Sequence, residues 1–284
     1  MLPYPIFEIG FFKFHMYGFM IAIGVFAALT VLEVYGRKLK VSGGFRDFMF
    51  FNTIAAILLG FGSATLFQAF YNYIEDPSVG FDLNGGMTFI GGLIGGVITF
   101  LIVYFILRPR LKGRLIQMIS VVPCAILIGH AFGRVGCFFA GCCYGNPTDS
   151  CLGVLFPKLK QPVHPTQLYE AAFLFIMFAV CSYLVLKLKF KYNMCVYLGA
   201  YGVFRFLLEY VRGDSRGEFI AGITPSQFWS LAMILASVGV YFLLKHAYAK
   251  TPLEELTELY ADAPEENTDD EIVEVIDSEE KEDN

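Results

Sequence analysis

The sequence predicts an all-α, polytopic membrane protein with about seven transmembrane helices. Of its 284 residues, 56% are hydrophobic and only 17% are charged, and the mean hydropathy is +0.58. Soluble domains carry about a quarter of charged residues. A membrane-spanning helix needs about 20 mainly apolar residues, so a chain of this length holds several spans and leaves little for a soluble domain.

The helices are predicted from apolar runs that end at charged breaks or at breaks rich in Gly and Pro. The first run lacks a clear small-residue cleavage site and is followed by Arg37, Lys38 and Lys40, so we interpret it as an uncleaved span rather than a secretory signal. The predicted helices lie near residues 16–35, 47–71, 87–107, 115–132, 167–186, 193–211 and 225–245.

Seven spans place the two ends of the chain on opposite sides of the membrane, and the basic residues indicate the orientation. They concentrate in alternate connections, which the positive-inside rule assigns to the cytoplasm. We therefore expect the N-terminus outside, the C-terminus in the cytoplasm, and outer connections at residues 72–86, 133–166 and 212–224. The basic residues are Arg37, Lys38, Lys40, Arg108, Arg110, Lys112, Arg114, Lys187, Lys189, Lys191, Lys245 and Lys250.

The charge distribution divides the chain into two predicted domains. The net charge is −5, but the acidic residues are unevenly distributed along the chain, because 15 of the 26 lie between Glu254 and Asp283. Residues 251–284 are therefore expected to form an acidic, disordered cytoplasmic tail. Residues 1–250 hold 20 basic and 11 acidic residues, a net charge of +9 that suits anionic lipid head groups better than nucleic acid.

The sixth predicted span carries charge along one helix face. Tyr201, Arg205, Glu209 and Arg212 are spaced by four, four and three residues, which places them on one side of a helix. A charged residue in hydrocarbon costs roughly 2.5–3.5 kcal/mol on insertion scales, so such residues line a substrate path or pair with one another. A purely structural Arg205–Glu209 pair is the alternative interpretation.

The segment GRVGCFFAGCCYG, residues 133–145, is predicted to lie just beyond the fourth span. It offers Arg134, whose planar guanidinium suits bidentate binding of a phosphate group. Gly133, Gly136 and Gly145 would allow the backbone to approach a ligand closely, or would serve turns and helix packing. Arginines at a membrane surface indicate an anionic ligand, and the abundant anion in lipid is the phosphodiester.

Two further groups are candidates for substrate contact. A plausible polar wall opens the fifth span in the motif HPTQLYE, where Pro165 suits a first helical turn and the helix end favours anions. It consists of His164, Gln167, Tyr169 and Glu170. His164 could equally be a hydrogen-bonding anchor. Tyr17, at the outer end of the first span, is either an aromatic-belt residue or a substrate contact.

Four of the seven cysteines cluster in the sequence, at positions 137, 142, 143 and 151. With His130 and His164 nearby in the sequence, they offer enough ligands for zinc. Their C-x4-C-C-x7-C spacing, however, matches no usual zinc site, and adjacent cysteines rarely both bind one ion, so we assign no metal and no cofactor. A disulfide, a thiolate activated by Arg134, and inert packing stay open for these cysteines.

Taken together, these motifs resemble the bacterial phosphatidylglycerol–prolipoprotein diacylglyceryl transferases. The resemblance covers about residues 17–244, and rests on MYGFM (16–20), GGMTFIGGLIGG (85–96), the 133–145 segment, HPTQLYE and YGVFRFLLEYVRGD (201–214). It implies a multi-pass protein of the bacterial plasma (inner) membrane with its site on the outer-leaflet side. It also implies functional roles for Tyr17, Arg134, Gly145, Arg205 and Glu209.

The resemblance implies the reaction as well. The family moves diacylglycerol from phosphatidylglycerol to the lipobox cysteine thiol of an exported prolipoprotein, which forms a thioether and releases glycerol phosphate. Arg134 and Arg205 would hold the phosphodiester, where negative charge develops in the transition state, and Glu209 would orient Arg205.

The chain departs from the family pattern at several positions. Ile90 stands where the family has the histidine of its SFHGG motif. Cys137, Ala140 and Cys142 replace Asn, Asn and Glu, and Gly62–Thr65 occupies a stretch where an arginine is expected. We expect at least one of the Cys137 and Cys142 sulfurs to lie beside Arg134. A non-catalytic phospholipid-binding or transport protein, and a membrane thiol-redox protein that uses the cysteines, are the alternative functions.

Overall fold

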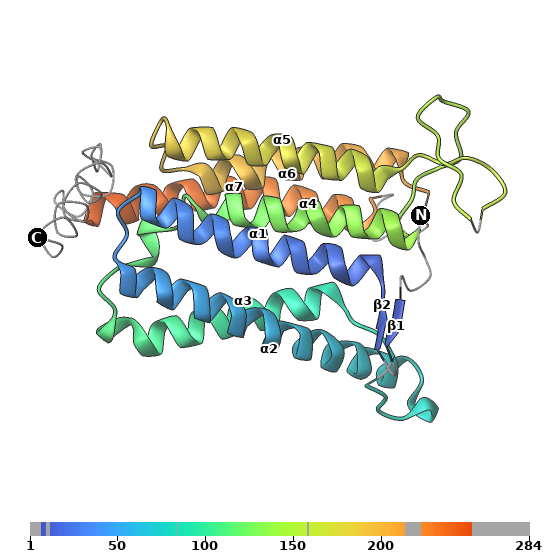
Figure 1. The fold of residues 1–284 in the computed structure, drawn as a ribbon, viewed down its shortest axis with the longest axis horizontal. Coiled ribbons are helices and arrows are strands. Elements are labelled where there is room, and N and C mark those ends of the chain that lie inside the picture. Colours follow the sequence, from blue (N-terminus) through green and yellow to red (C-terminus); the bar gives the residue numbers. More distant parts are fainter. Residues whose placement is uncertain (1–6, 10–11, 84, 158, 214–222, 252–284) are drawn as a thin grey trace, which may run out of the picture.

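The computed structural model describes residues 7–9, 12–83, 85–157, 159–213 and 223–251, and within them it is a bundle of seven long helices (Figure 1). All seven are long and apolar enough to cross a membrane, which confirms the predicted fold class. The predicted tail lies almost entirely outside the described residues. The helices are α1 (Met16–Lys38), α2 (Gly43–Glu75), α3 (Phe89–Leu107), α4 (Val122–Ala140), α5 (Thr166–Leu186), α6 (Asn193–Leu208) and α7 (Pro225–Lys250).

The helices form two groups. The long α2 and α3 lie as a pair along one side of the bundle, while α1 packs on α4, and α4 to α7 gather on the other side (Figure 1). The buried apolar core lies mainly between α1, α4, α5 and α6, with Leu32, Leu127 and Leu174 among its members. Polar side chains inside the second group therefore lie close to a packed core rather than to lipid.

Short elements complete the described chain. A two-stranded antiparallel hairpin, β1 (Phe7–Ile9) and β2 (Phe12–Phe14), precedes α1 and pairs Phe7 with Phe14. The sequence did not predict this hairpin. A 3-10 turn at Glu209–Val211 ends the sixth span, and others lie at Pro77–Val79, Arg108–Arg110 and Leu115–Gln117.

The predicted position of the fourth helix was wrong. The apolar residues from Leu115 form a 3-10 turn, and α4 begins only at Val122, where Pro123 occupies the first helical turn. The helix continues through Arg134 and ends at Gly141, whose φ of 68° is left-handed. Residues 133–140 are therefore part of a membrane-spanning helix and not of an outer loop. A helix can hold Arg134 because a carboxylate on α5 pairs with it.

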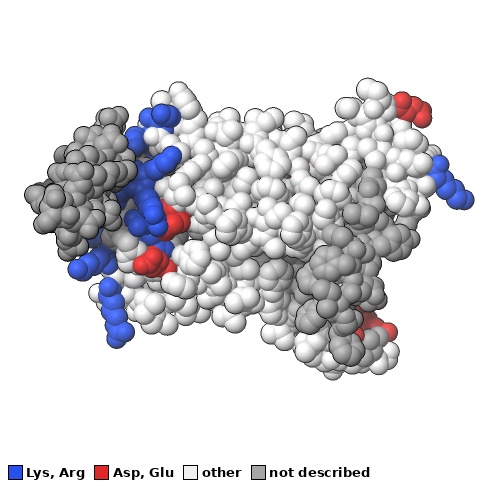
Figure 2. All heavy atoms as spheres, viewed as in Figure 1, with Lys and Arg blue, Asp and Glu red and all other residues white. Residues whose placement is uncertain are grey.

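Lysines and arginines gather at one end of the bundle (Figure 2). The connections α1–α2, α3–α4 and α5–α6 and the end of α7 all lie at that end, because successive helices run in opposite directions. There Glu33 bonds to Arg37 at 2.6 Å and to Arg46 at 3.2 Å. The asymmetry that the sequence predicted is present in the fold, and the assignment of this end to the cytoplasm stays a prediction.

Candidate active site

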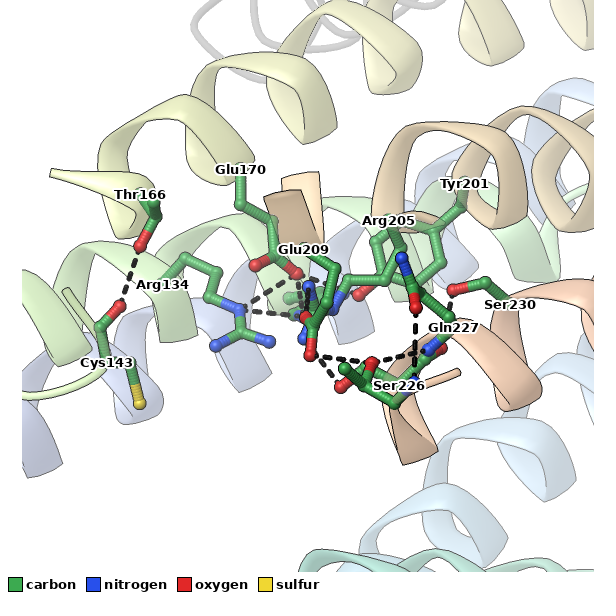
Figure 3. Close-up of polar contacts among 12 residues, drawn as sticks. Arg134, Cys143, Thr166, Glu170, Tyr201, Arg205, Glu209, Ser226, Gln227 and Ser230 are labelled. Carbon is green, nitrogen blue, oxygen red and sulfur yellow. Dashed lines mark hydrogen bonds and ion pairs between the residues drawn. The ribbon is translucent and has the colours of Figure 1, made fainter. Parts of the chain in front are cut away.

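A buried carboxylate joins three helices near the middle of the second group. Glu170 of α5 pairs through Oε1 with Arg134 Nε of α4 at 3.0 Å, and it accepts a hydrogen bond from the Tyr201 hydroxyl of α6 at 2.7 Å (Figure 3). Its side chain is only 1% exposed. Because a buried charge is costly without a partner, this network fixes α4, α5 and α6 relative to one another.

His130 extends the network along α4. It lies one turn before Arg134 on the same helix face, so both side chains reach Glu170. Its Nε2 atom lies 3.5 Å from Glu170 Oε1 and accepts a hydrogen bond from Arg134 Nε at 3.3 Å, while its ring meets the Tyr201 ring edge-on at 5.4 Å. The imidazole and the carboxylate thus form an adjacent pair that can take up or release a proton.

Arg134 retains donors for a ligand. Among the described residues, its polar side-chain contacts to Glu170 and His130 both use Nε. The two Nη groups are the fork that a phosphate prefers, and they extend beyond the ion pair (Figure 3). Glu170 therefore orients the guanidinium without covering its two Nη groups.

The predicted Arg205–Glu209 pair is present. Arg205 Nη1 lies 2.8 Å from Glu209 Oε2, and its Nη2 donates to Ser226 Oγ of α7 at 3.0 Å. Glu209 also accepts a hydrogen bond from Thr224 Oγ1 at 3.0 Å. Both side chains are buried, so the start of α7 and the end of α6 hold the second arginine in a fixed orientation.

The two arginine–glutamate pairs belong to one polar centre. Figure 3 shows Arg134, Glu170, Arg205 and Glu209 converging between their helices. Tyr201 shares a helix face with Arg205, as predicted, but its hydroxyl bonds to Glu170, so the same face connects both pairs. His130 also interacts electrostatically with Arg205. Two guanidinium groups near one point can bind a single anion.

Gly145 is where three segments cross. Its N–H donates to the His164 carbonyl at 2.8 Å, and it forms a bridge with Arg212, which is itself buried. A Cβ at Gly145 would lie 2.5 Å from the Val211 carbonyl oxygen and 2.8 Å from Thr166 Cγ2. Only glycine fits this position, and the crossing attaches the chain after α4 to the start of α5 and the end of α6.

Three cysteines converge at the end of α4. The sulfurs of Cys137, Cys142 and Cys143 all lie within 4.8 Å of one another. Of the two sulfurs expected beside Arg134, those of Cys137 and Cys142, Cys137 interacts electrostatically with this arginine. Cys143, which the expectation did not include, interacts with both Arg134 and Arg212. All described cysteines are free thiols, and Cys151 is exposed outside this group.

The thiols of Cys142 and Cys143 differ in acidity. Hydrogen bonds from the Cys137 and Cys142 thiols, followed by the charges of Arg212 and Arg134, lower the pKa of Cys143 below its ordinary value. The pKa of Cys142 is raised, because its thiol is hydrogen-bonded to Cys137 and Cys143 and because it is partly buried. The structure therefore favours a thiolate at Cys143.

Tyr17 and two glycines of α4 lie on the α1 side of this cluster. Tyr17 is 43% exposed and interacts electrostatically with all three cysteines and with Arg134. A Cβ at Gly136 would lie 3.2 Å from the Tyr17 ring, so this glycine sets how closely α1 approaches α4. A Cβ at Gly133 would meet nothing within 4 Å. Tyr17 thus lies beside the thiols as well as beside the arginine.

The remaining candidates from HPTQLYE have separate partners. Gln167 is buried, and its Nε2 donates to the Cys142 carbonyl, while the neighbouring Thr166 Oγ1 donates to the Cys143 carbonyl at 2.8 Å. His164 Nδ1 lies 3.1 Å from the Tyr169 hydroxyl. His164 and Tyr169, predicted from the sequence as substrate contacts, thus contact each other. Their substrate role stays a prediction.

Sequence reasoning placed Glu170 in a polar wall and His130 among possible zinc ligands, but it did not select either of them as a site residue. The signal for Glu170 was available, because it is an acidic residue near the start of an apolar helix, and the same rule had selected Glu209. His130 gave a weaker signal, one turn before Arg134 in a helix whose position was predicted too early. The misplaced fourth span accounts for the omission of His130 alone, since Glu170 lies on the fifth.

The comparisons with known proteins match this arrangement. The sequence profile of the prolipoprotein diacylglyceryl transferases matches residues 5–243. The chain belongs to the prolipoprotein diacylglyceryl transferase family. It is 33% identical over 245 residues to the phosphatidylglycerol–prolipoprotein diacylglyceryl transferase of Clostridium tetani, covering 83% of this chain and 95% of the relative. The Bordetella bronchiseptica enzyme of the same name is 33% identical over 261 residues, covering 85% and 97%.

Family membership makes this a protein of a transferase family with bacterial relatives, and the seven apolar helices make it a multi-pass membrane protein. The departures from the family pattern now have positions in the fold. Ile90 lies at the start of α3 and is 44% exposed, whereas Cys137 and Cys142 belong to the thiol cluster beside Arg134. The changes thus fall in both helix groups of this family member.

Proposed function

We propose that this chain transfers the diacylglyceryl group of phosphatidylglycerol to the lipobox cysteine thiol of an exported prolipoprotein. The observation that carries the proposal is the array of Arg134–Glu170 and Arg205–Glu209 pairs, both with buried carboxylates, in a family member. The substrates come from the names of the relatives, and the array supplies the paired guanidinium groups that a phosphodiester requires.

In the proposed reaction the acceptor thiol attacks the glyceryl carbon that bears the phosphate. A sulfur–carbon bond forms and the carbon–oxygen bond breaks, and the electron pair leaves with glycerol phosphate. Arg134 and Arg205 stabilise the negative charge that develops on the leaving phosphate. Glu170 and Glu209 act as positioning residues, since each fixes one guanidinium through an ion pair.

The thiol proton needs an acceptor, because the thiolate is the nucleophile. The family histidine is replaced by Ile90, and His130 with Glu170 forms the proton-accepting pair closest to Arg134 in the described chain. We therefore assign the proton to this pair. Tyr17, Gly145, Gln167 and Arg212 surround the same end of α4 and would line the path of the lipid head group or of the acceptor peptide.

We also propose that the site faces the outer leaflet of the bacterial plasma membrane. The basic end of the bundle would lie in the cytoplasm by the positive-inside rule. The thiol cluster and Gly145 belong to the opposite end, since they follow α4, which starts at the basic end. Accessibility of a tag after Lys250 in spheroplasts tests this orientation: the tag is expected to be protected, and an accessible tag contradicts it.

The decisive experiment measures transfer from phosphatidylglycerol labelled in its diacylglycerol part to a lipobox peptide, by the purified full chain in phosphatidylglycerol vesicles. Arg205→Ala is expected to reduce transfer by about 100-fold or more, as for loss of a group that stabilises transition-state charge. Arg108→Ala is the matched control, because this arginine is exposed at the basic end.

A double variant separates phosphate binding from a structural ion pair. Arg205→Ala leaves Glu209 buried without its cation, which destabilises the protein by itself. Arg205→Ala with Glu209→Ala removes both charges. Recovery of thermal stability without recovery of transfer supports the proposal, whereas recovery of both contradicts it. Lipid binding by the wild type without any transfer would favour the phospholipid-binding alternative.

A further inference from the structure

The three sulfurs at the end of α4 form a set that one metal ion can use. Each pair of sulfurs among Cys137, Cys142 and Cys143 lies within 4.8 Å. Zinc–thiolate bonds are about 2.3 Å long, so three sulfurs around one ion lie about 4 Å apart. The observed spacing is compatible with that geometry. A disulfide, in contrast, would join two sulfurs and leave the third unused.

The backbone explains how two adjacent cysteines can face the same point. Adjacent side chains in extended chain point to opposite sides, which is why such pairs seldom share an ion. Here Cys143 has a φ of 63°, a left-handed conformation that non-glycine residues seldom adopt. It follows the left-handed Gly141, which ends α4. These two turns bring Cys142 and Cys143 back toward Cys137.

The start of α5 holds this turn in place. Gln167 and Thr166 bond to the carbonyls of Cys142 and Cys143, and the Cys142 N–H bonds to the Cys137 carbonyl at 3.2 Å. Hydrogen bonds of this kind orient metal ligands in known sites. The ligand positions are therefore prepared by the fold before any ion binds.

Charge and access also suit a metal. Three thiolates around a divalent ion carry a net charge of −1, and the Cys143 sulfur interacts electrostatically with both Arg134 and Arg212, which offset such a charge. Cys142 is exposed, which gives an ion a route from solvent. Thiolate sulfur is a soft ligand that selects Zn²⁺ and Cu⁺ over Mg²⁺ or Ca²⁺.

We propose that Cys137, Cys142 and Cys143 bind one thiophilic metal ion of the Zn²⁺ or Cu⁺ class at the end of α4. Binding replaces the thiol protons, which pass to the solvent, and involves no oxidation or reduction. Because Tyr17 and Arg134 interact with the same thiols, an ion held there lies next to the proposed transferase residues.

Cobalt titration tests the proposal directly. The full-length protein in detergent, kept anaerobic with a phosphine reductant, is titrated with Co²⁺, and thiolate-to-cobalt charge-transfer absorption is recorded. We expect saturation at one equivalent and displacement of Co²⁺ by Zn²⁺. Absence of the thiolate band, or a disulfide between two of the three cysteines in the protein isolated under reductant, overturns the proposal.

Single substitutions identify the ligands. Loss of a hydrogen-bond partner of a ligand weakens metal binding about 10- to 100-fold, so loss of a ligand in Cys137→Ser, Cys142→Ser or Cys143→Ser is expected to weaken Co²⁺ binding by at least about tenfold. Cys151→Ser is the matched control, because Cys151 is an exposed cysteine of the same outer segment and lies outside the cluster. Equal Co²⁺ affinity in all four variants overturns the assignment.

A second measurement avoids the need for any variant to fold. In the wild-type protein, bound Zn²⁺ should protect the three cluster cysteines from alkylation by N-ethylmaleimide, while Cys151 reacts in the same sample and serves as the internal control. Mass spectrometry gives the modified positions. Equal alkylation of the cluster with and without Zn²⁺ contradicts the proposal, whatever the outcome of the lipid-transfer assay.

Discussion

The α2–α3 pair and the α4–α7 group pack apolar helices in different ways. In the first, small residues allow close approach: Ser63 Oγ donates to the Gly91 carbonyl at 2.9 Å, and Gly92 lies against Ala64. In the second, the Arg134–Glu170 ion pair joins α4 to α5, and hydrogen bonds of Arg205 and Glu209 join the end of α6 to the start of α7. Since lipid is as apolar as leucine, helices associate either through tight small-residue contacts or through polar bonds.

The difference indicates where chemistry is possible in this chain. The α2–α3 pair contains Ile90, where the family carries a histidine, and the described part of α3 has no charged residue. The α4–α7 group retains both arginines and adds His130 and the thiol cluster. Changes in the α4–α7 group should therefore affect reaction and stability together, and changes in the α2–α3 pair should affect stability alone.

Glu170→Gln should have the largest effect. The substitution removes a buried carboxylate and leaves Arg134, whose side chain is 20% exposed, without its anion, which should cost up to about 3 kcal/mol of folding free energy and most of the transfer activity. Glu33→Gln is the control, because Glu33 also pairs with two arginines but is 25% exposed at the basic end, and should lose no more than about 1 kcal/mol. Thermal unfolding in detergent measures the loss of stability, and the lipobox-peptide assay measures the loss of transfer activity. Equal losses in Glu170→Gln and Glu33→Gln would contradict the distinction between the buried and the exposed carboxylate.

Gly91→Ala tests whether the α2–α3 pair contributes to stability alone. A Cβ at Gly91 would lie 2.4 Å from Phe67 Cβ, so α3 must move away from α2, and we expect a loss of about 1–3 kcal/mol in stability. Gly62→Ala is the matched control on α2, since a Cβ there would meet nothing within 4 Å. The transfer rate per folded molecule should be the same in both variants. A rate that falls with Gly91→Ala would show that the α2–α3 pair takes part in the site.

Alkylation kinetics sharpen the description of the α4–α7 group. The lowered pKa of Cys143 and the raised pKa of Cys142 predict more thiolate at Cys143 near neutral pH, although Cys142 is the more exposed of the two. In metal-free protein, iodoacetamide should modify Cys143 faster than Cys142, by roughly tenfold. Time-resolved peptide mapping measures both rates. Faster reaction at Cys142 would mean that exposure, and not the hydrogen bonds of the cluster, controls reactivity.

Ile90→His should have the smallest effect on the rate of transfer. It restores the family residue type on α3, but the described proton-accepting pair lies on α4 and α5, so we expect transfer within about threefold of the wild type. The lipobox-peptide assay at several pH values measures this. A gain of tenfold or more would assign the proton-accepting step to α3 and remove it from the His130–Glu170 pair.

The sequence by itself determined the features that depend on local pattern. Apolar runs set the number of spans, and alternate basic connections set the charged end, because both follow from transfer of side chains between water and lipid. Helical spacing alone was enough to predict the Arg205–Glu209 pair, since residues four apart share a helix face. The family resemblance also came from short motifs and needed no tertiary information.

Only the tertiary structure decided which polar groups meet across helices. The contact of Arg134 with Glu170 depends on how α4 packs on α5, and the hydrogen bond of Tyr201 to Glu170 depends on how α6 lies against α5. The cysteines converge because Gly141 and Cys143 take left-handed backbone conformations, which spacing in the sequence does not reveal. These contacts join residues far apart in the chain, so the packing of whole helices selects them rather than any local preference.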